Sequence, residues 1–468
     1  MTRRTGSALT VAIVGWLGLI LAGTEARAQG RVPNFPLGVA IPDGSGQNGL
    51  FWLGGDSPFG TYIAPEVSFW AFGDTFLSSP GVNSRQLSSV VANTIAIGLI
   101  VDGKFTPKYF YKGSAANKQA FFPNPDGSHK FWPKASAMIG GKLFVFLTLE
   151  LVNLTVPLGD SGGAIETGVL VARVDNPTDI PTIWRVDYLT MHIEDPGRQA
   201  NLKLGIEVLP SHGAVDGLVV YGFFNNAATR TNKSIVLLVS NRTLLTTPGG
   251  YAIDPGQFQY LAADPGNVNP HWKPGKGPYS GGPDDYLDTE IDSVSGYTVR
   301  WNAMLGRWQV VGANSQYAAL YPYPAGSAYT PLPFARIFTH PSPFGPFIRS
   351  PQASNCYFYK FSDLDSPDRT LVCYTARQWQ DPLDPAYNTD AHLLLTYTYS
   401  SMVVQDQERN PNLYQTHQVL LPNPYTGPPG TLTPCAAPPL TGLNPPPKAA
   451  TPDPFAAPGT PRPLPFPR

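Results

Sequence analysis

The 468-residue sequence contains few charged residues, only three cysteines and little helical periodicity. Lys, Arg, Asp and Glu make up 14% of the chain and the formal net charge is −1. The chain therefore lacks the concentrated basic face that binding to a phosphate backbone requires, and we expect no nucleic-acid partner. Three cysteines are too few for a disulfide scaffold in a chain of this length.

Several catalytic motifs are also absent. The sequence has no Gly-x-Ser-x-Gly elbow, no phosphate-binding loop and no dinucleotide fingerprint, which argues against serine hydrolases, nucleotide enzymes and dehydrogenases. The histidines do not follow the HExxH spacing, so a zinc site is not expected. The repeated Ser-x-Asp-x-Gly-x-x-Trp turns of sialidases are missing as well.

The cysteines leave two alternatives open. Cys356 and Cys373 lie in two apolar runs that would pair as a hairpin, so a cross-strand disulfide is compatible with an oxidising compartment. Two reduced, buried thiols are equally compatible with the pattern. Cys435 would then be the odd cysteine.

The N-terminus has the pattern of an export signal. Arg3 and Arg4 precede an apolar stretch over 9–22, and the small-x-small cleavage pattern follows at 26–28. The stretch is shorter than the roughly 20 residues of a membrane-spanning helix, which disfavours an uncleaved anchor. We predict a signal peptide over 1–28, a secreted or periplasmic mature protein, and no membrane span after cleavage.

Glycine, proline and aromatic residues are abundant. The chain has 46 Gly and 51 Pro, and aromatics make up 12%. This composition is typical of many short strands joined by tight turns. No linker interrupts 29–420, which we interpret as one domain, whereas 421–468 is rich in proline and is predicted to be a disordered tail.

A short apolar element recurs five times, each time after a turn. Its copies are separated by 74, 75, 90 and 63 residues and lie at 67–72, 141–146, 216–221, 306–311 and 368–374. Each interval can hold four short strands with their turns, which is one blade of a β-propeller. We therefore predict an all-β, five-bladed β-propeller over 29–420, and favour it over one or two β-sandwiches.

Asp56 and Asp74 are the candidate catalytic carboxylates. Both follow glycine in the first repeat, and Asp74 comes where an apolar run ends. Cleavage of a glycosidic bond needs two carboxyl groups, one as acid and one as nucleophile or base. The alternative is that both residues hold turns through side-chain hydrogen bonds, and on pattern alone this alternative is slightly favoured.

The same region resembles a known family. The resemblance rests on 52–56, 69–76, Asn93-Thr94, Phe131-Trp132-Pro133, 290–302 and 344–347. These segments are similar to a secreted five-bladed propeller family, formerly of unknown function, that includes bacterial endo-D-arabinofuranases cutting mycobacterial arabinan. The resemblance spans most of Gln29 to about Ser400 and implies that Asp56 and Asp74 are the acid and the nucleophile or base.

Some segments depart from the family pattern. The residues between Asp56 and Trp70 are rich in Gly and Pro, the loops at 153–163 and 265–282 are idiosyncratic, and the tail is not shared. These departures leave the identity of the sugar open, although the two-carboxylate chemistry is still implied.

Further residues are candidates for substrate binding. They are Trp52, Asn93, His129, Trp132, Glu290 and Arg377. Glu290 belongs to an acidic cluster over 284–292 whose spacing fits no EF-hand. We interpret the cluster as a solvated loop, with a structural calcium ion as the alternative, and expect no other cofactor and no catalytic metal.

These observations give one leading function and two alternatives. The leading one is a monomeric glycoside hydrolase acting on a furanose-containing (arabinan-type) or related polysaccharide. The first alternative is a non-catalytic propeller that binds a carbohydrate or the cell envelope. The second is a structural interaction module whose function lies in the Pro-rich tail.

Overall fold

The structure is a computed structural model of the whole chain, and its description covers a defined set of residues. These are 33–42, 48–79, 84–124, 129–152, 164–194, 200–210, 216–226, 231–263, 270–277, 285–291, 296–302, 306–313, 321–322, 335–340, 342–349, 370–379, 392–401, 407–408 and 414–422. The predicted signal peptide, nearly all of the predicted tail, and Cys356 and Cys435 lie outside these residues.

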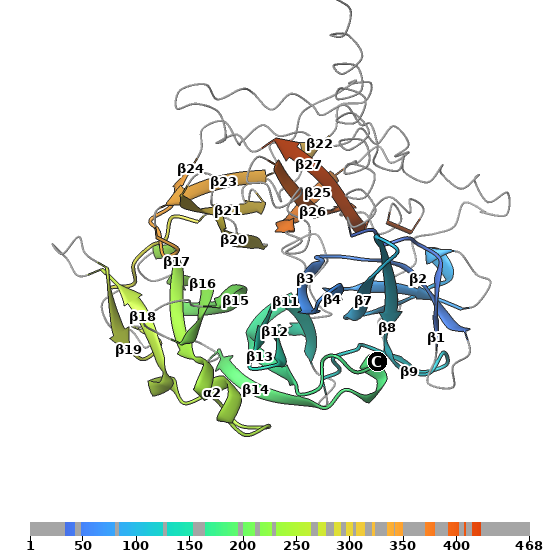
Figure 1. Cartoon of the computed structure of the whole chain (residues 1–468), viewed down its shortest axis with the longest axis horizontal. Coiled ribbons are helices and arrows are strands. Elements are labelled where there is room, and N and C mark those ends of the chain that lie inside the picture. The colour runs from blue at the N-terminus through green and yellow to red at the C-terminus, as the bar shows by residue number, and fades with distance from the viewer. Residues whose placement is uncertain are drawn as a thin grey trace, which may run out of the picture.

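Antiparallel strands form sheets that radiate from a central axis, the arrangement of a β-propeller (Figure 1). The first sheet consists of β3 (Phe59–Ala64), β4 (Val67–Phe72), β7 (Thr94–Val101) and β8 (Lys104–Phe110). A second sheet beside it consists of β1 (Val39–Pro42), β2 (Asn48–Gly55), β5 (Thr75–Ser78) and β6 (Ser89–Val91). The two short strands β9 (Lys112–Gly113) and β10 (Lys118–Gln119) pair with each other.

Two further sheets continue the ring. One consists of β11 (His129–Ile139), β12 (Lys142–Val152), β13 (Ala164–Val174) and β14 (Val186–Ile193). The next consists of β15 (Ala200–Pro210), β16 (Gly217–Asn226), β17 (Thr231–Ser240), β18 (Phe258–Ala262) and β19 (His271–Pro274). Short helical segments lie between strands, namely η1 (Arg85–Leu87), η3 (Pro181–Ile183), α2 (Asn241–Thr246) and η4 (Pro255–Gln257).

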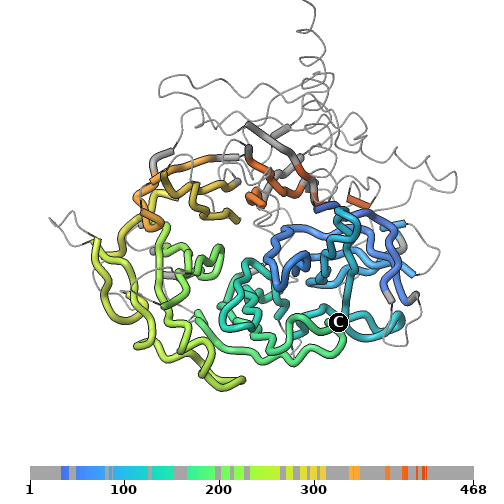
Figure 2. Tube along the Cα trace, viewed as in Figure 1, coloured from blue at the N-terminus to red at the C-terminus, as the bar shows by residue number. Residues whose placement is uncertain are grey.

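The last two sheets complete the described part of the ring. One consists of β20 (Tyr297–Asn302), β21 (Arg307–Ala313), β23 (Ala335–His340) and β24 (Ile348–Arg349). The other consists of β22 (Tyr321–Pro322), β25 (Thr370–Trp379), β26 (His392–Ser401) and β27 (Gln415–Pro422). The chain passes around the axis in sequence order, as the colours of Figure 2 show.

The five repeated apolar elements all form strands, namely β4, β12, β16, β21 and β25. Each is the second strand in the order of its sheet. A strand in this place is covered by neighbouring sheets on both faces, which explains why its residues are apolar without alternation. The all-β class predicted from the sequence is thus confirmed.

Strand β12 shows how the sheets pack. Leu143 and Val145 belong to the core cluster that also contains Phe69 of the first sheet. Phe144 points to the opposite face and belongs to the cluster that contains Val220 of the next sheet. Successive side chains of a strand alternate between faces, so one apolar strand supplies two core clusters. Apolar burial between adjacent sheets therefore holds the ring together.

The first and last sheets of the ring meet at a seam. The rings of Trp70 and Trp379 lie with their centroids 4.4 Å apart, and both belong to one core cluster. The backbone N–H of Ser57 donates a hydrogen bond of 3.1 Å to the Thr398 hydroxyl. These contacts join β4 and the start of β3 to β25 and β26.

The end of the domain differs slightly from the predicted boundary at residue 420. Leu421 and Pro422 continue β27 and pair with Leu393 and His392 of β26. No helix within the described residues is long and apolar enough to cross a membrane.

Candidate active site

Asp56 and Asp74 lie side by side where their chain segments leave the first two sheets. β2 ends at Gly55 and β4 ends at Phe72, so Asp56 follows a strand end directly and Asp74 follows one after Gly73. The backbone N–H of Asp56 donates to the Asp74 carbonyl at 3.3 Å, and the N–H of Gly73 donates to the Asp56 carbonyl at 2.9 Å. This pairing brings two residues that are distant in sequence to one place in the structure.

Gly73 allows the Asp56 carboxylate to approach Trp132. A Cβ atom at this position would lie 2.1 Å from Asp56 Oδ1 and 1.9 Å from Trp132 Nε1. Both distances are far below van der Waals contact, so a larger residue would displace one or both side chains. The absence of a side chain at Gly73 is therefore a condition for this arrangement.

Lys130 connects Asp74 to a third carboxylate. Its Nζ atom lies 3.0 Å from Asp74 Oδ2 and 3.3 Å from Oδ1, and 3.7 Å from Glu150 Oε2. The register of β11 and β12 places Lys130 opposite Glu150. Burial alone would lower the pKa of Lys130, but the charges of Asp74 and Glu150 outweigh burial and raise this pKa above its usual value.

Glu150 is buried, with 1% of its surface exposed. Burial raises its pKa to about 7, although Lys134 and Lys130 act in the opposite direction; the charges of Asp74 and Glu166 add to the increase. A carboxyl group with a pKa near neutrality can hold or release a proton at neutral pH. The sequence analysis did not single out Glu150 or Lys130.

Glu166 lies opposite Glu150 in the register of β12 and β13 and has a different environment. Its carboxylate lies 2.8 Å from Lys203 Nζ and 3.6 Å from Lys134 Nζ. Burial would raise the pKa of Glu166, but these two lysines outweigh burial and lower it. Adjacent strands thus present two carboxyl groups whose pKa values are shifted in opposite directions.

The two candidate aspartates differ in exposure. Asp56 is 1% exposed, whereas 24% of the Asp74 side chain is accessible. The bonds between them join main-chain groups and leave both carboxylates uninvolved, so they do not test the side-chain turn role considered for both residues. The Asp74 carboxylate, however, is oriented by Lys130 and remains partly accessible, as a group that meets a ligand must be.

Trp52 and Asn93, which the sequence analysis proposed for substrate binding, occupy buried positions. Trp52 is fully buried and stacks on Tyr109 with ring centroids 4.4 Å apart. Asn93 is also fully buried: its side-chain amide donates to the carbonyls of Phe122 and Phe131, and its oxygen accepts from the Phe122 N–H. In this structure both side chains are therefore engaged in the core, and their role in binding stays a prediction.

Trp132 and His129 lie on β11 near the aspartates. Trp132 is half-buried, and the ammonium groups of Lys130 and Lys134 lie 5.4 Å and 4.5 Å from its ring centroids. His129 is half-buried at the first position of the strand, opposite Leu151. The placement of Trp132 agrees with a binding role beside Asp56.

Glu290 lies on the loop before β20 and is exposed. Its backbone N–H donates to Asp288 at 2.9 Å, and partial burial together with the Asp288 charge raises its pKa. Asp285 of the same acidic cluster pairs with Lys273 at 2.6 Å. Among the described residues, no group of three or more His, Cys, Asp or Glu is arranged to hold a metal ion.

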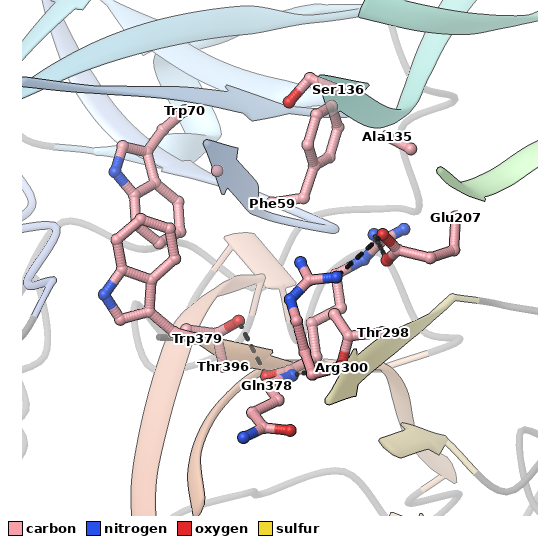
Figure 3. Close-up of a pocket in the computed structure, with 12 residues that line it drawn as sticks. Phe59, Trp70, Ala135, Ser136, Glu207, Thr298, Arg300, Gln378, Trp379 and Thr396 are labelled. Carbon is pink, nitrogen blue, oxygen red and sulfur yellow. Dashed lines mark hydrogen bonds and ion pairs between the residues drawn. The ribbon is translucent and has the colours of Figure 1, made fainter. Parts of the chain in front are cut away.

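Arg377 is one of the residues that line a pocket on the central axis, and Figure 3 shows this pocket. Arg377 is 5% exposed, and its guanidinium donates to the carbonyls of Lys134 and Ile206. Five sheets line this pocket, with residues from β3 and β4, β11, β15, β20, and β25 and β26. Asp56 and Asp74 are not among the lining residues, so the pocket and the carboxylate pair are separate features.

The radiating sheets and the cluster of carboxylates define an all-β protein of propeller-like architecture with an acidic site beside its first sheet. A solved protein of Bacteroides ovatus ATCC 8483, described provisionally as a hydrolase, has a TM-score of 0.52 at 14% identity, over 83% of this chain and 95% of that chain. That similarity shows a common fold. No protein-family model and no curated protein matches the sequence.

Two other solved structures match with lower scores. An endo-arabinase of Bacteroides thetaiotaomicron VPI-5482 has a TM-score of 0.34 at 11% identity, over 83% of this chain and 97% of that chain. A β-xylosidase/α-arabinofuranosidase from a compost microbial metagenome has a TM-score of 0.34 at 11% identity, over 79% of this chain and 91% of that chain.

Proposed function

We propose that the protein is a glycoside hydrolase that cleaves a furanose-containing (arabinan-type) or related polysaccharide with Asp56 and Asp74. The observation that carries the proposal is the pairing of these residues at one end of the first sheet, with Lys130 bound to the Asp74 carboxylate at 3.0 Å. In this proposal the five sheets that line the axial pocket are the blades of a closed five-bladed propeller, and the protein is a secreted or periplasmic monomer.

The different environments of the two aspartates support a division of roles. Glycosidic cleavage requires one carboxyl that gives a proton and one carboxylate that attacks or activates water. Asp56 is buried beside Trp132, whereas Asp74 is partly exposed and lies against an ammonium group. Two carboxyl groups in unequal surroundings are the usual basis for separate acid and base functions.

Neighbouring groups support the carbohydrate assignment. Trp132 presents an aromatic ring beside the carboxylates, and such rings pack against the apolar faces of sugars. Lys130 fixes the position of the Asp74 carboxylate, which a reaction that depends on orientation requires. The proposal extends to this chain the hydrolase activity provisionally attributed to the Bacteroides ovatus protein of the same fold. The arabinan-type substrate follows from the family resemblance at 52–56 and 69–76.

The test is incubation of the mature protein with a panel of polysaccharides that includes arabinogalactan. We expect wild type to release oligosaccharides and the D56N and D74N variants each to lose at least about a hundredfold in rate. The matched control is D102N, an exposed aspartate at the turn between β7 and β8, which should keep full activity. Equal activity of wild type, D56N and D74N would refute the assignment.

The burial of Asp56 favours a second candidate, a carbohydrate-binding propeller without catalysis. A residue that is 1% exposed has little contact with a ligand in this conformation. This alternative predicts that polysaccharide binds to wild type without release of products, and that D56N leaves the affinity unchanged. Affinity measurements on the same variants and polysaccharides separate the two functions.

A further inference from the structure

The axial pocket holds an imbalance of charge. Arg300 Nη1 lies 3.3 Å from Glu207 Oε1 (Figure 3), and Arg377 Nη1 lies 3.6 Å from Glu207 Oε2. Two guanidinium groups therefore share one carboxylate, which is the one acidic group among the described residues that line the pocket. Charges removed from water are costly unless they are compensated, so the surplus positive charge calls for a counterion.

The surroundings of Arg377 agree with incomplete compensation. Its Nη2 atom donates to main-chain carbonyls of β11 and β15, but its buried Nε atom has no acceptor among the described residues. Burial lowers the pKa of Arg377 to about 10; Glu207 opposes this shift, and Arg300 adds to it. The nearby second cation thus increases the cost of the charge on Arg377.

Other buried polar atoms of the lining residues also have no partner. Within the described part of the chain, Trp379 Nε1 and Ser136 Oγ have none. A buried donor without an acceptor destabilises the folded state. Gln378 Oε1 is a buried acceptor that also has no partner among the described residues, and a water molecule would have to donate a hydrogen bond to it. The pocket therefore combines surplus positive charge with N–H and O–H groups that lack acceptors.

We propose that the axial pocket binds a small monovalent anion of the halide class next to Arg300 and Arg377. A single negative charge balances the surplus, and a spherical anion accepts hydrogen bonds from several directions. The Arg300 side chain is 29% exposed, which gives the ion a route from solvent. The anion would connect β11, β20 and β25, and thereby stabilise the ring independently of the proposed hydrolase activity.

The first test measures thermal unfolding in sodium chloride, bromide and gluconate at constant ionic strength. We expect halide to raise the midpoint by about 2 to 4 °C in a saturable manner, and gluconate to have no such effect. The R300Q variant should lose the halide effect, whereas R307Q, at an exposed site on the neighbouring strand β21, should retain it. Identical midpoints in all three salts would overturn the proposal.

The second test needs no variant, so it holds even where R300Q does not fold. Crystals of the wild-type protein soaked in bromide should show an anomalous peak within about 3.5 Å of an Arg377 nitrogen. A water molecule in place of the peak would overturn the proposal. A peak without a halide effect on unfolding would show an adventitious ion only. If E207Q folds, it should bind halide at least about tenfold more tightly, because it removes the competing carboxylate.

Discussion

Lys130 Nζ lies 3.0 Å from Asp74 Oδ2 and 3.7 Å from Glu150 Oε2, so one ammonium group forms ion pairs with an accessible carboxylate and with a buried one. Asp74 lies in the turn between β4 and β5 and Glu150 lies on β12, and Lys130 is the group that couples them. A change in the charge of Glu150 must therefore alter how strongly Lys130 attracts Asp74. This coupling makes the electrostatics of the candidate site testable without knowledge of the substrate.

Replacement of Lys130 by Met should disturb both carboxylates. We expect hydrolysis of the responsive polysaccharide to fall by about a hundredfold, because Asp74 loses the group that orients it. The pKa of Glu150, measured by NMR, should rise above about 7, since Lys130 acts to lower it. The control is Lys142→Met, which breaks the ion pair with Asp175 at the far end of β12. An unchanged Glu150 pKa in the Lys130 variant would contradict the coupling.

The raised pKa of Glu150 makes stability depend on pH. The folded chain holds this proton up to about pH 7, whereas the unfolded chain releases it near 4.5. The folded state therefore binds more protons between these values, and the free energy of unfolding falls as pH rises through this window. The fall should amount to about 3 kcal/mol and be absent in E150Q. Denaturant titrations of both proteins at pH 4 and pH 8 measure it, and an equal change in the free energy of unfolding of the two proteins would refute the assignment.

Gly73 should not tolerate alanine. The new methyl group would overlap Asp56 Oδ1 and Trp132 Nε1, so one side chain must move. We expect a stability loss of about 1–3 kcal/mol and a larger relative loss of polysaccharide hydrolysis. Gly256→Ala serves as control, because the nearest atom to its Cβ would be at 3.4 Å. Equal losses of stability and of hydrolysis in the two variants would show that the arrangement of Asp56 and Trp132 does not require glycine at position 73.

Removal of Trp379 should weaken the seam of the ring. Its ring packs against Trp70 and Tyr62 and is 7% exposed. We expect Trp379→Ala to cost about 3–5 kcal/mol. Urea titration monitored by circular dichroism gives the value, and Trp301→Ala, at a residue 47% exposed, gives the reference for an accessible tryptophan. A cost equal to that of the reference would mean that the seam contributes little.

The sequence predicted the strands better than the site. Apolar runs such as 141–146 are long enough to identify buried strands, because burial on both faces leaves little choice of residue. Asp56 and Asp74 were chosen as candidates because each follows a glycine and Asp74 comes where such a run ends. Trp52 and Asn93 are buried, and a sequence pattern does not distinguish aromatic and amide side chains in a core from those in a binding site.

The sequence analysis did not single out Lys130 and Glu150, because the strand register that pairs them differs from the one that their hairpin turn predicts. The hairpin of β11 and β12 begins with Ile139 opposite Lys142, a register that would bring Lys130 opposite Leu151. An irregularity between Pro133 and Ala135 shifts the pairing by one residue and brings Glu150 there instead. The sequence signal for Glu150 was that it is the single acid within the apolar run 143–152. The bulge that places it opposite Lys130 is set by tertiary packing, which the sequence pattern does not show.

The hydrogen bond from Ser57 to Thr398 spans 341 positions and anchors the residue next to Asp56. During biosynthesis the ribosome makes the aspartate long before it makes this anchor. A nascent or prematurely terminated chain that stops before residue 392 would carry every candidate carboxylate and still lack the strand that fixes the first of them. Competence of the site is therefore a property of the finished chain, acquired only when its last sheet docks onto its first.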